Sequence, residues 1–197
     1  MPDSIARLYE RHARDYDRDR GRSLQERAWL DRFADLIPAG AAVLDLGCGM
    51  GEPIAGYLIR RGVQVTGVDT SPTLIEMCRA RFPAHEWIVA DMRRLALGRS
   101  FEGLLAWDSV FHLSMNDQRA MFEVFAAHAR RGAALMFTSG TGEGESVGSY
   151  RGEPLYHASL SSGEYRARLA EHGFEVLMHV VDDADCGNHT VWLARRT

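Results

Sequence analysis

The sequence predicts an α/β fold with a mostly parallel sheet, because strand-like and helix-like segments alternate along most of the chain. Short apolar runs of strand length are followed by longer segments whose apolar residues recur at helical spacing. Two consecutive strand-like segments, residues 174–181 and 189–194, predict a strand pair at the C-terminal end. With 197 residues and 46% hydrophobic composition, we expect a single domain spanning 1–197 with a sizeable core.

The expected elements follow in order. Residues 4–17 predict a first helix, and Ser23 with Glu26 predicts a capping box for a second helix that presents apolar residues from Trp29 to Ile37. Strands are expected within 43–46, 63–69, 87–90, 104–107 and 132–139, before the terminal pair. Helices are expected after Glu52-Pro53, Ser71-Pro72, Ser114 and Ser161, with Pro53 at a first helical position. Residues 140–152 are rich in Gly, Ser and Glu and predict a mobile loop.

The segment VLDLGCGMG, residues 43–51, joins a buried strand to a turn with three glycines. Glycine allows backbone conformations and close approaches that a side chain obstructs, so a ligand can reach the main chain there. The following helix turns its free N–H groups toward this turn. The pattern predicts a site for a nucleotide-type cofactor.

Acidic residues follow or interrupt the neighbouring strands. Asp45 lies inside the first strand, two positions before the first glycine, and Asp69 ends the second strand about 20 residues further on. A carboxylate at the end of the second strand, where Asp69 lies, can accept hydrogen bonds from both ribose hydroxyls. Asp91 follows the third strand, and Asp108 follows the fourth. Because ligands of open α/β sheets bind beyond the carboxyl ends of the strands, these acids should share one edge.

These motifs resemble those of the class I S-adenosylmethionine-dependent methyltransferases, over roughly residues 40–195. VLDLGCGMG resembles their motif I, and VQVTGVDTSP, WIVADM and LLAWDSVFHL resemble the three motifs that follow it. The resemblance implies a Rossmann-like seven-stranded sheet, helices on both faces and an antiparallel C-terminal strand pair. It implies S-adenosylmethionine as cofactor and no metal. The cofactor-binding residues that it implies are Tyr16, Asp45, Gly47, Cys48, Gly49, Asp69, Thr70, Asp91, Met92, Trp107 and Asp108.

Within that set, Asp69 is the expected ribose ligand, and Asp91 with Met92 is expected at the adenine. A helix cap is the alternative reading of Asp91, and an ordinary packing contact is the alternative for Tyr16. A nicotinamide-dependent oxidoreductase would share the glycine turn and the ribose acid, but Asp45 and the C-terminal strand pair count against it. A cofactor-binding sensor or inactive scaffold could keep all four motifs.

Composition excludes several other functions. All 23 basic residues are arginine, so chemistry that needs a lysine nucleophile or a phosphate-loop lysine is impossible. The net charge is −4, and the arginines of residues 3–35 interleave with acids, which predicts a solvated helix face rather than a nucleic-acid surface. The sequence lacks the run of about 18 apolar residues that a membrane span needs, and its charged N-terminus is unlike a signal peptide. We expect a cytoplasmic monomer or homodimer, and the three cysteines argue against a disulfide framework or a zinc site.

A sulfonium methyl is already electrophilic, so the chemistry needs an aligned nucleophile, removal of its proton where it is a hydroxyl, and exclusion of water. The predicted acceptor is a small molecule methylated on O, N or S. His112, which follows the fourth strand, and His157 are the candidate catalytic residues, with cofactor positioning as the alternative role for His112. The helices within 1–38 and the segment 140–160 are expected to act as lids over this edge.

Overall fold

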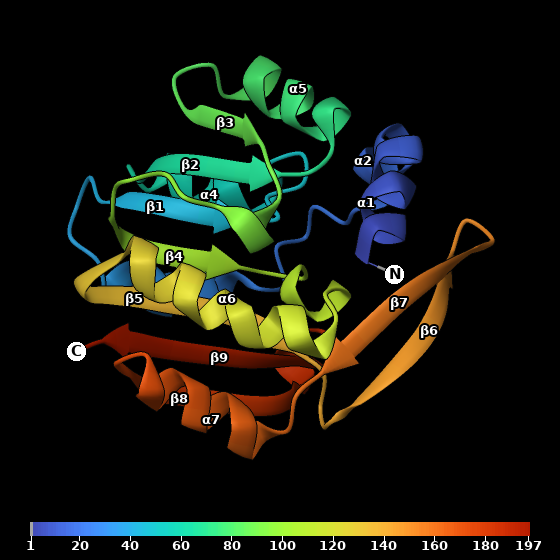
Figure 1. Ribbon diagram of the computed structural model, residues 1–197. Helices are drawn as coiled ribbons and strands as arrows, with labels where there is room; N and C mark the ends of the chain where they lie inside the picture. The colour runs from blue at the N-terminus through green and yellow to red at the C-terminus, as the bar shows by residue number, and fades with distance from the viewer. Residues whose placement is uncertain (1) are drawn as a thin grey trace.

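The computed structural model describes residues 2–197, and its centre is a seven-stranded sheet with the order β3-β2-β1-β4-β5-β9-β8 (Figure 1). The strands are β1 (Ala42–Leu46), β2 (Gln64–Asp69), β3 (Glu86–Val89), β4 (Phe101–Ala106), β5 (Ala129–Ser139), β8 (Phe174–Asp183) and β9 (His189–Arg196). Strands β1 to β5 pair in parallel, whereas β9 is antiparallel to both β5 and β8. The predicted fold class and its antiparallel C-terminal pair are confirmed.

The strand order reverses between β1 and β4, where Val43 is in register with Gly103 and Asp45 with Leu105. From β1 the chain proceeds to β2 and β3 on one side, and it then returns to β4 on the other side. At such a switch point the connections diverge and leave a crevice beyond the carboxyl ends of the strands. The glycine turn after β1 and the residues after β4 therefore face each other.

Helices cover both faces of the sheet. One core contains side chains of α6 (Met115–His128) and α7 (Ser162–Glu171), and the other contains those of α3 (Arg27–Asp35), α4 (Ile54–Arg60) and α5 (Pro72–Arg81). Trp29, Leu30 and Phe33 of α3 are at most 1% exposed. Helix α3 is therefore a core helix, although it lies within the 1–38 segment expected as a lid.

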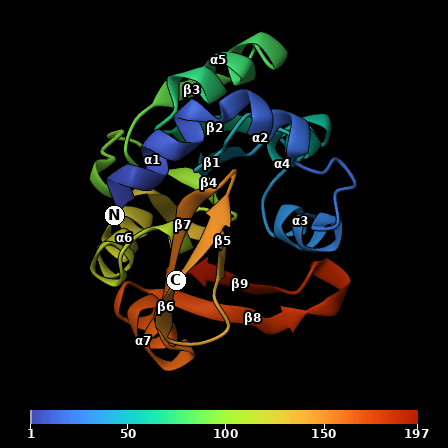
Figure 2. The same ribbon diagram turned by 90° about the vertical axis from the view of Figure 1, so that its right-hand side faces the viewer.

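Only the first two helices of that segment lie over the sheet edge. Helices α1 (Pro2–Arg11) and α2 (Ala13–Asp19) replace the single helix expected over 4–17 and pass across the carboxyl ends of the strands (Figure 2). The carboxylate of Glu10 anchors α1 to the start of α5, where it accepts hydrogen bonds from the Thr73 backbone N–H at 3.1 Å and the Thr73 hydroxyl at 2.7 Å. A carboxylate at a helix N-terminus is favourable because it meets free N–H groups.

The segment expected as a mobile loop forms a second, two-stranded sheet. Strands β6 (Gly144–Tyr150) and β7 (Glu153–Ser159) pair in antiparallel register, with Val147 opposite Tyr156. Irregular structure over 140–152 was therefore a wrong prediction, because its small and polar residues carry little strand signal and the pairing with 153–159 supplies the order. This β6–β7 hairpin extends from the sheet toward α1 and α2 (Figures 1 and 2).

Helix starts were predicted with mixed success. The hydroxyls of Ser71, Ser114 and Ser161 accept the backbone N–H three residues further on, as capping requires. The box expected from Ser23 and Glu26 is absent: Glu26 itself is the N-cap of α3 and its side chain makes no capping bond. Pro53 precedes α4 as its N-cap residue rather than occupying the first helical position.

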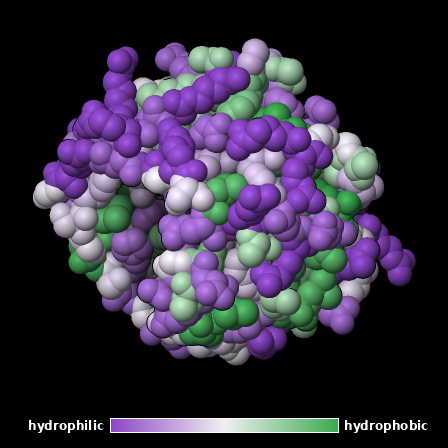
Figure 3. All heavy atoms as spheres, turned by 180° about the vertical axis from the view of Figure 1, so that it is seen from behind, coloured by the Kyte–Doolittle hydropathy of each residue, from purple (hydrophilic) through white to green (hydrophobic). Residues whose placement is uncertain are grey.

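The surface behind the view of Figure 1 is mainly hydrophilic, with hydrophobic atoms in separate groups (Figure 3). Among residues 2–197 no helix is both long and apolar enough to cross a membrane. Cys48, Cys78 and Cys186 are free thiols.

Candidate active site at the carboxyl edge of the sheet

The glycine turn is fixed by the backbone of the neighbouring strand. The N–H groups of Gly47 and Cys48 donate to the carbonyl oxygen of Val68 at 2.8 and 3.1 Å. Gly47 has a φ of +79°, and a Cβ on it would lie 2.4 Å from the Cβ of Ser109, which follows β4. Ser109 is itself held by its hydroxyl, which donates to the Leu46 carbonyl at 2.7 Å. No residue but glycine fits between these two strand ends.

Asp69 closes the other side of the turn at the end of β2. One carboxylate oxygen accepts the Gly49 N–H at 3.0 Å, and the other accepts the Ser71 N–H at 2.9 Å. Burial raises the pKa of this carboxyl, although the backbone hydrogen bonds oppose that shift. Asp69 therefore shapes the turn and also presents a carboxylate to the adjacent cavity.

That inner cavity contains most of the predicted cofactor residues. Its lining includes Tyr16, Gly47, Gly49, Asp69, Thr70, Asp91, Met92, Asp108 and His112. Asp91 also accepts the Arg93 backbone N–H at 2.9 Å and the Arg93 guanidinium at 2.6 Å. Burial alone would raise the pKa of Asp91, but these bonds from Arg93 lower it. Asp91 therefore caps the short helix that follows β3 and also lines the inner cavity.

A second space, which we call the glycine-turn cavity, shares Gly47 and Gly49 with the inner cavity. It contains the remaining predicted cofactor residues, Asp45, Cys48 and Trp107, together with Arg20. Asp45 is 4% exposed, and burial together with the nearby Asp69 raises its pKa to about 7. The indole nitrogen Nε1 of Trp107 is buried and has no hydrogen-bond partner within the described part of the chain. A buried donor without a partner is costly and indicates a ligand group at that position.

Arg20 was missed as a site residue, because the sequence predicted that Arg20 and the charged residues around it lie on a solvated helix face. Its side chain is 18% exposed and donates at 2.6 Å to Glu26, which is 1% exposed. The available signal was its position four residues after Tyr16, which puts both residues on one side of the chain. Arg20 lines the glycine-turn cavity and also the larger cleft beside it.

This outer cleft has a volume of about 770 Å³. Besides Arg20, its wall includes Tyr9, Tyr16, Asp108, Phe111, His112, His157 and His189. Tyr16 and Asp108 line the inner cavity, the glycine-turn cavity and the outer cleft, so the three spaces meet at these two side chains. A ligand with two arms in the cavities would therefore turn its centre toward the cleft.

Asp108 adopts a φ of +49°, which is unusual for a residue other than glycine, at the end of β4. Its backbone N–H donates to the Thr138 hydroxyl at 2.8 Å, and its carboxylate lies 3.0 Å from Nε2 of His189. The other ring nitrogen of His189 lies 2.6 Å from the Cys186 carbonyl. Both ring nitrogens of His189 therefore face acceptors, and the bond to Asp108 raises the pKa of His189.

His112 and His157 lie side by side with ring centroids 4.8 Å apart, His112 from the turn after β4 and His157 from β7. Burial lowers the pKa of His112 to about 4, and burial also lowers the pKa of His157. Both rings are therefore neutral near pH 7. His112 lines both the inner cavity and the outer cleft, whereas His157 lines only the outer cleft.

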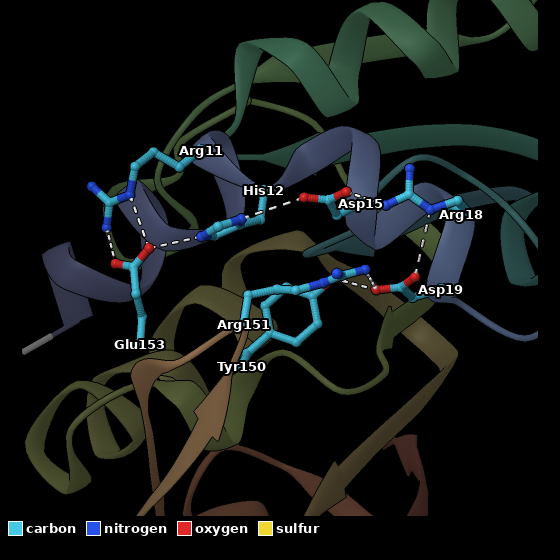
Figure 4. Close-up of polar contacts among 8 residues, drawn as sticks. All are labelled: Arg11, His12, Asp15, Arg18, Asp19, Tyr150, Arg151 and Glu153. Atoms are coloured by element: carbon cyan, nitrogen blue, oxygen red, sulfur yellow. Dashed lines mark hydrogen bonds and ion pairs between the residues drawn. The ribbon is translucent and has the colours of Figure 1, made fainter.

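Helices α1 and α2 contact the hairpin above this junction through charged pairs (Figure 4). The carboxylate of Glu153 binds Arg11 and lies 2.7 Å from Nε2 of His12, and Asp19 binds Arg151. We call these contacts the lid contacts. Within residues 2–197 no group of three or more His, Cys, Asp or Glu side chains is arranged to hold a metal ion.

Comparison with known proteins agrees with this architecture. Residues 43–132 match the family model described as a methyltransferase domain. An O-methyltransferase from Pyrenophora dematioidea is 30% identical over 165 residues, covering 77% of this chain and 61% of that protein. A magnesium-protoporphyrin O-methyltransferase from Rhodobacter capsulatus is 34% identical over 124 residues, covering 60% and 53%. The chain thus spans between about half and three fifths of the length of these relatives.

Solved structures show the same fold at low identity. Magnesium protoporphyrin IX methyltransferase from Synechocystis PCC 6803 superposes with a TM-score of 0.73 at 17% identity, covering 100% of this chain and 97% of that one. An amino pentose methyltransferase from Micromonospora echinaspora gives a TM-score of 0.72 at 20% identity, covering 96% and 97%. These structures show that the chain has the fold of S-adenosylmethionine-dependent methyltransferases, and its residues 43–132 match a methyltransferase domain.

Proposed function

We propose that this protein is an enzyme that transfers the methyl group of S-adenosylmethionine to an oxygen, nitrogen or sulfur atom of a small molecule. The observation that carries the proposal is the meeting of three spaces at Tyr16 and Asp108. Two of them suit the two arms of the cofactor, and the third is open to an acceptor. Transfer requires this geometry, because the methyl group lies on the sulfur between the two arms.

In this proposal the inner cavity holds adenosine. Asp69 accepts hydrogen bonds from the ribose hydroxyls, next to Thr70, and Asp91 accepts one from the adenine amino group. Met92 offers its backbone and an apolar surface to the base. The fit is supported by Gly47 and Gly49, because a Cβ on Gly47 would collide with Ser109 and one on Gly49 would touch Tyr16 at 3.4 Å.

The glycine-turn cavity is proposed to hold the methionyl arm, whose ammonium and carboxylate need opposite partners. Asp45 and Asp108 supply negative charge for the ammonium. Arg20 and the unpartnered Nε1 of Trp107 supply donors for the carboxylate. An orphaned indole N–H beside an arginine is the arrangement that a carboxylate would complete, which is the main reason to add Arg20 to the cofactor residues.

Small-molecule acceptors are supported by the cleft itself, whose wall combines residues of α1, α2 and the β6–β7 hairpin with residues that follow β4 and precede β9. Several relatives also carry names with small-molecule substrates, among them a trans-aconitate 2-methyltransferase from Enterobacter sp. (strain 638), 40% identical over 72 residues. The lids α1, α2 and β6–β7 would exclude water from the sulfonium centre. A monomeric or homodimeric assembly and a cytoplasmic location stay predictions of the sequence.

The test is turnover. The protein is incubated with S-adenosylmethionine and a panel of small phenols, amines, thiols and carboxylates, and S-adenosylhomocysteine is quantified. We expect release of S-adenosylhomocysteine that requires one acceptor class and that is reduced in Asp69→Ala when S-adenosylmethionine is below saturation. Tight cofactor binding without turnover on any acceptor would instead identify a sensor or scaffold, and binding of NAD in place of S-adenosylhomocysteine would identify an oxidoreductase.

A further inference from the structure

The protonation of His112 is fixed by its two hydrogen bonds. Nδ1 lies 2.9 Å from the backbone carbonyl oxygen of Tyr156 on β7. A carbonyl only accepts, so Nδ1 carries the hydrogen. Since burial keeps the ring neutral at pH 7, Nε2 holds the free lone pair.

Tyr9 of α1 forms a hydrogen bond with that lone pair. Its hydroxyl oxygen lies 3.1 Å from Nε2 of His112, and because Nε2 can only accept, the hydroxyl donates. Burial, with Tyr16 and nearby acids, raises the pKa of Tyr9, so the phenol remains protonated. The Tyr9 oxygen keeps its own lone pairs free to accept a hydrogen bond. Tyr9 lines both the inner cavity and the outer cleft, at the place where an acceptor would meet the methyl group.

We propose that Tyr9 is a catalytic residue that takes the proton of the acceptor while passing its own proton to His112, and that the acceptor is therefore a neutral hydroxyl compound methylated on oxygen. This inference rests on the proposed function. The acceptor O–H bond breaks and its proton goes to the Tyr9 oxygen, while the Tyr9 proton goes to Nε2 of His112. The acceptor oxygen bonds to the methyl carbon, and the methyl–sulfur bond breaks with its electron pair left on sulfur.

The charges around the junction favour this reaction. The positive charge moves from sulfur to the imidazole, so the number of charges in the enclosed site is unchanged, which permits a base as weak as the buried His112. The titratable groups facing His112 are Tyr9 from α1, His157 from β7 and Asp108 after β4. Of these, Asp108 raises the pKa of His112 and so favours the imidazolium that forms.

The outer cleft suits a hydroxyl on an aromatic ring better than a carboxylate. Among the residues that line the cleft, Arg20 pairs with Glu26 and is assigned above to the methionyl carboxylate, and His189 pairs with Asp108. A carboxylate acceptor would find no further arginine among the described residues of the cleft, and it would not need a proton acceptor. The rings of Phe111 and His157 lie in the wall of the outer cleft with centroids 5.3 Å apart and planes tilted by 37°, and they offer ring faces and edges to a phenol.

The first test needs no acceptor. The imidazole nitrogen resonances of His112 are measured by NMR in the protein saturated with S-adenosylhomocysteine. We expect the neutral form with hydrogen on Nδ1 between pH 5.5 and 8, and a shift of the Nε2 resonance in Tyr9→Phe because its hydrogen bond is lost. Hydrogen on Nε2, or an imidazolium at pH 7, would overturn the relay.

The second test measures kcat on phenols with Tyr9→Phe. We expect kcat to fall about 100-fold, a typical loss for proton transfer, with unchanged affinity for S-adenosylhomocysteine. The loss should shrink to a few fold on a nitro-substituted phenol that is already ionised at the assay pH. The control is Tyr150→Phe, because Tyr150 is also a lid tyrosine, stacks on Tyr9 and directs its hydroxyl to Asp19 instead.

Unchanged kcat in Tyr9→Phe, an equal loss on ionised and un-ionised phenols, or turnover restricted to amines or carboxylates would overturn the inference while leaving methyl transfer intact. Failure to bind S-adenosylhomocysteine in the unmodified protein would instead contradict the proposed function.

Discussion

The two sides of the candidate site are built in different ways. On the sheet side, the glycine turn is held by buried backbone hydrogen bonds to Val68 and by close contact with Ser109. On the lid side, α1 and α2 meet the β6–β7 hairpin through charged pairs of Glu153 and Asp19, whose side chains are 34% and 37% exposed. Exposed ion pairs contribute little stability and weaken with salt.

This difference indicates a division of labour. The sheet side is too tightly packed to rearrange and is suited to hold a cofactor in one place. The charged pairs between the helices and the hairpin are weak enough to break and admit an acceptor, and α1 contributes Tyr9 to the junction. Substitutions on the sheet side should therefore have large effects, and substitutions of the lid contacts should have small ones.

The largest effect is expected from Gly47→Ala. The new Cβ would collide with Ser109 at 2.4 Å, and the φ of +79° disfavours alanine, so the turn must shift. We expect the affinity for S-adenosylhomocysteine, measured by calorimetry, to fall at least 100-fold, equivalent to about 3 kcal/mol. Gly142→Ala is the matched control near the hairpin, because a Cβ there meets nothing within 4 Å. If both variants bound S-adenosylhomocysteine with similar affinity, the sheet side would be no more sensitive to substitution than the lid side.

Asp45→Asn should stabilise the unliganded protein while weakening its cofactor binding. The folded pKa of Asp45, about 7, is raised above the usual 3.8 by burial, so folding favours the protonated carboxyl. The contribution of this proton to the free energy of unfolding is fully present below pH 3.8 and is lost as the pH rises through 7. The gain in unfolding free energy over the parent should therefore grow from near zero at pH 4 to a few kcal/mol at pH 8. A gain independent of pH would show that Asp45 is not titrating there.

Asp69→Ala tests the ribose assignment. The net loss of one charge-assisted hydrogen bond worth roughly 1.5–3 kcal/mol should weaken S-adenosylmethionine binding by about 10- to 100-fold in equilibrium dialysis. Glu175→Ala, on the exposed surface of β8, is the control for removal of a carboxylate. The assignment would be contradicted if the two variants bound the cofactor equally well.

The smallest effect is expected from Glu153→Gln, which removes the carboxylate shared by Arg11 and His12. Because the pairs are exposed, the variant should lose about 0.2–1 kcal/mol in cofactor affinity at 50 mM salt, and the difference from the parent should vanish at 500 mM. A tenfold loss that persists at high salt would show that the lid side is as rigid as the sheet side.

The same contrast explains how much of the molecule the sequence predicts. The sheet side depends on short motifs, in which Asp45, Gly47 and Asp69 lie at fixed distances from predicted strands, so its cavity lining was predicted. The hairpin was not, because β6 acquires its structure from pairing with β7 and not from its own residues. The Arg20–Glu26 pair was also missed. The alternation of acids and arginines in this segment predicts exposed side chains, but the turn at Leu24, with a φ of +53°, directs Arg20 and Glu26 inward.

Binding of the methyl donor at this edge of the sheet decides the function of the protein most directly. Calorimetric titration of the unmodified protein with S-adenosylhomocysteine and, separately, with NAD tests it in one experiment. We predict saturable binding of one S-adenosylhomocysteine per chain and no heat from NAD beyond dilution. Heat from NAD, or no binding of S-adenosylhomocysteine by the folded protein, would contradict the account.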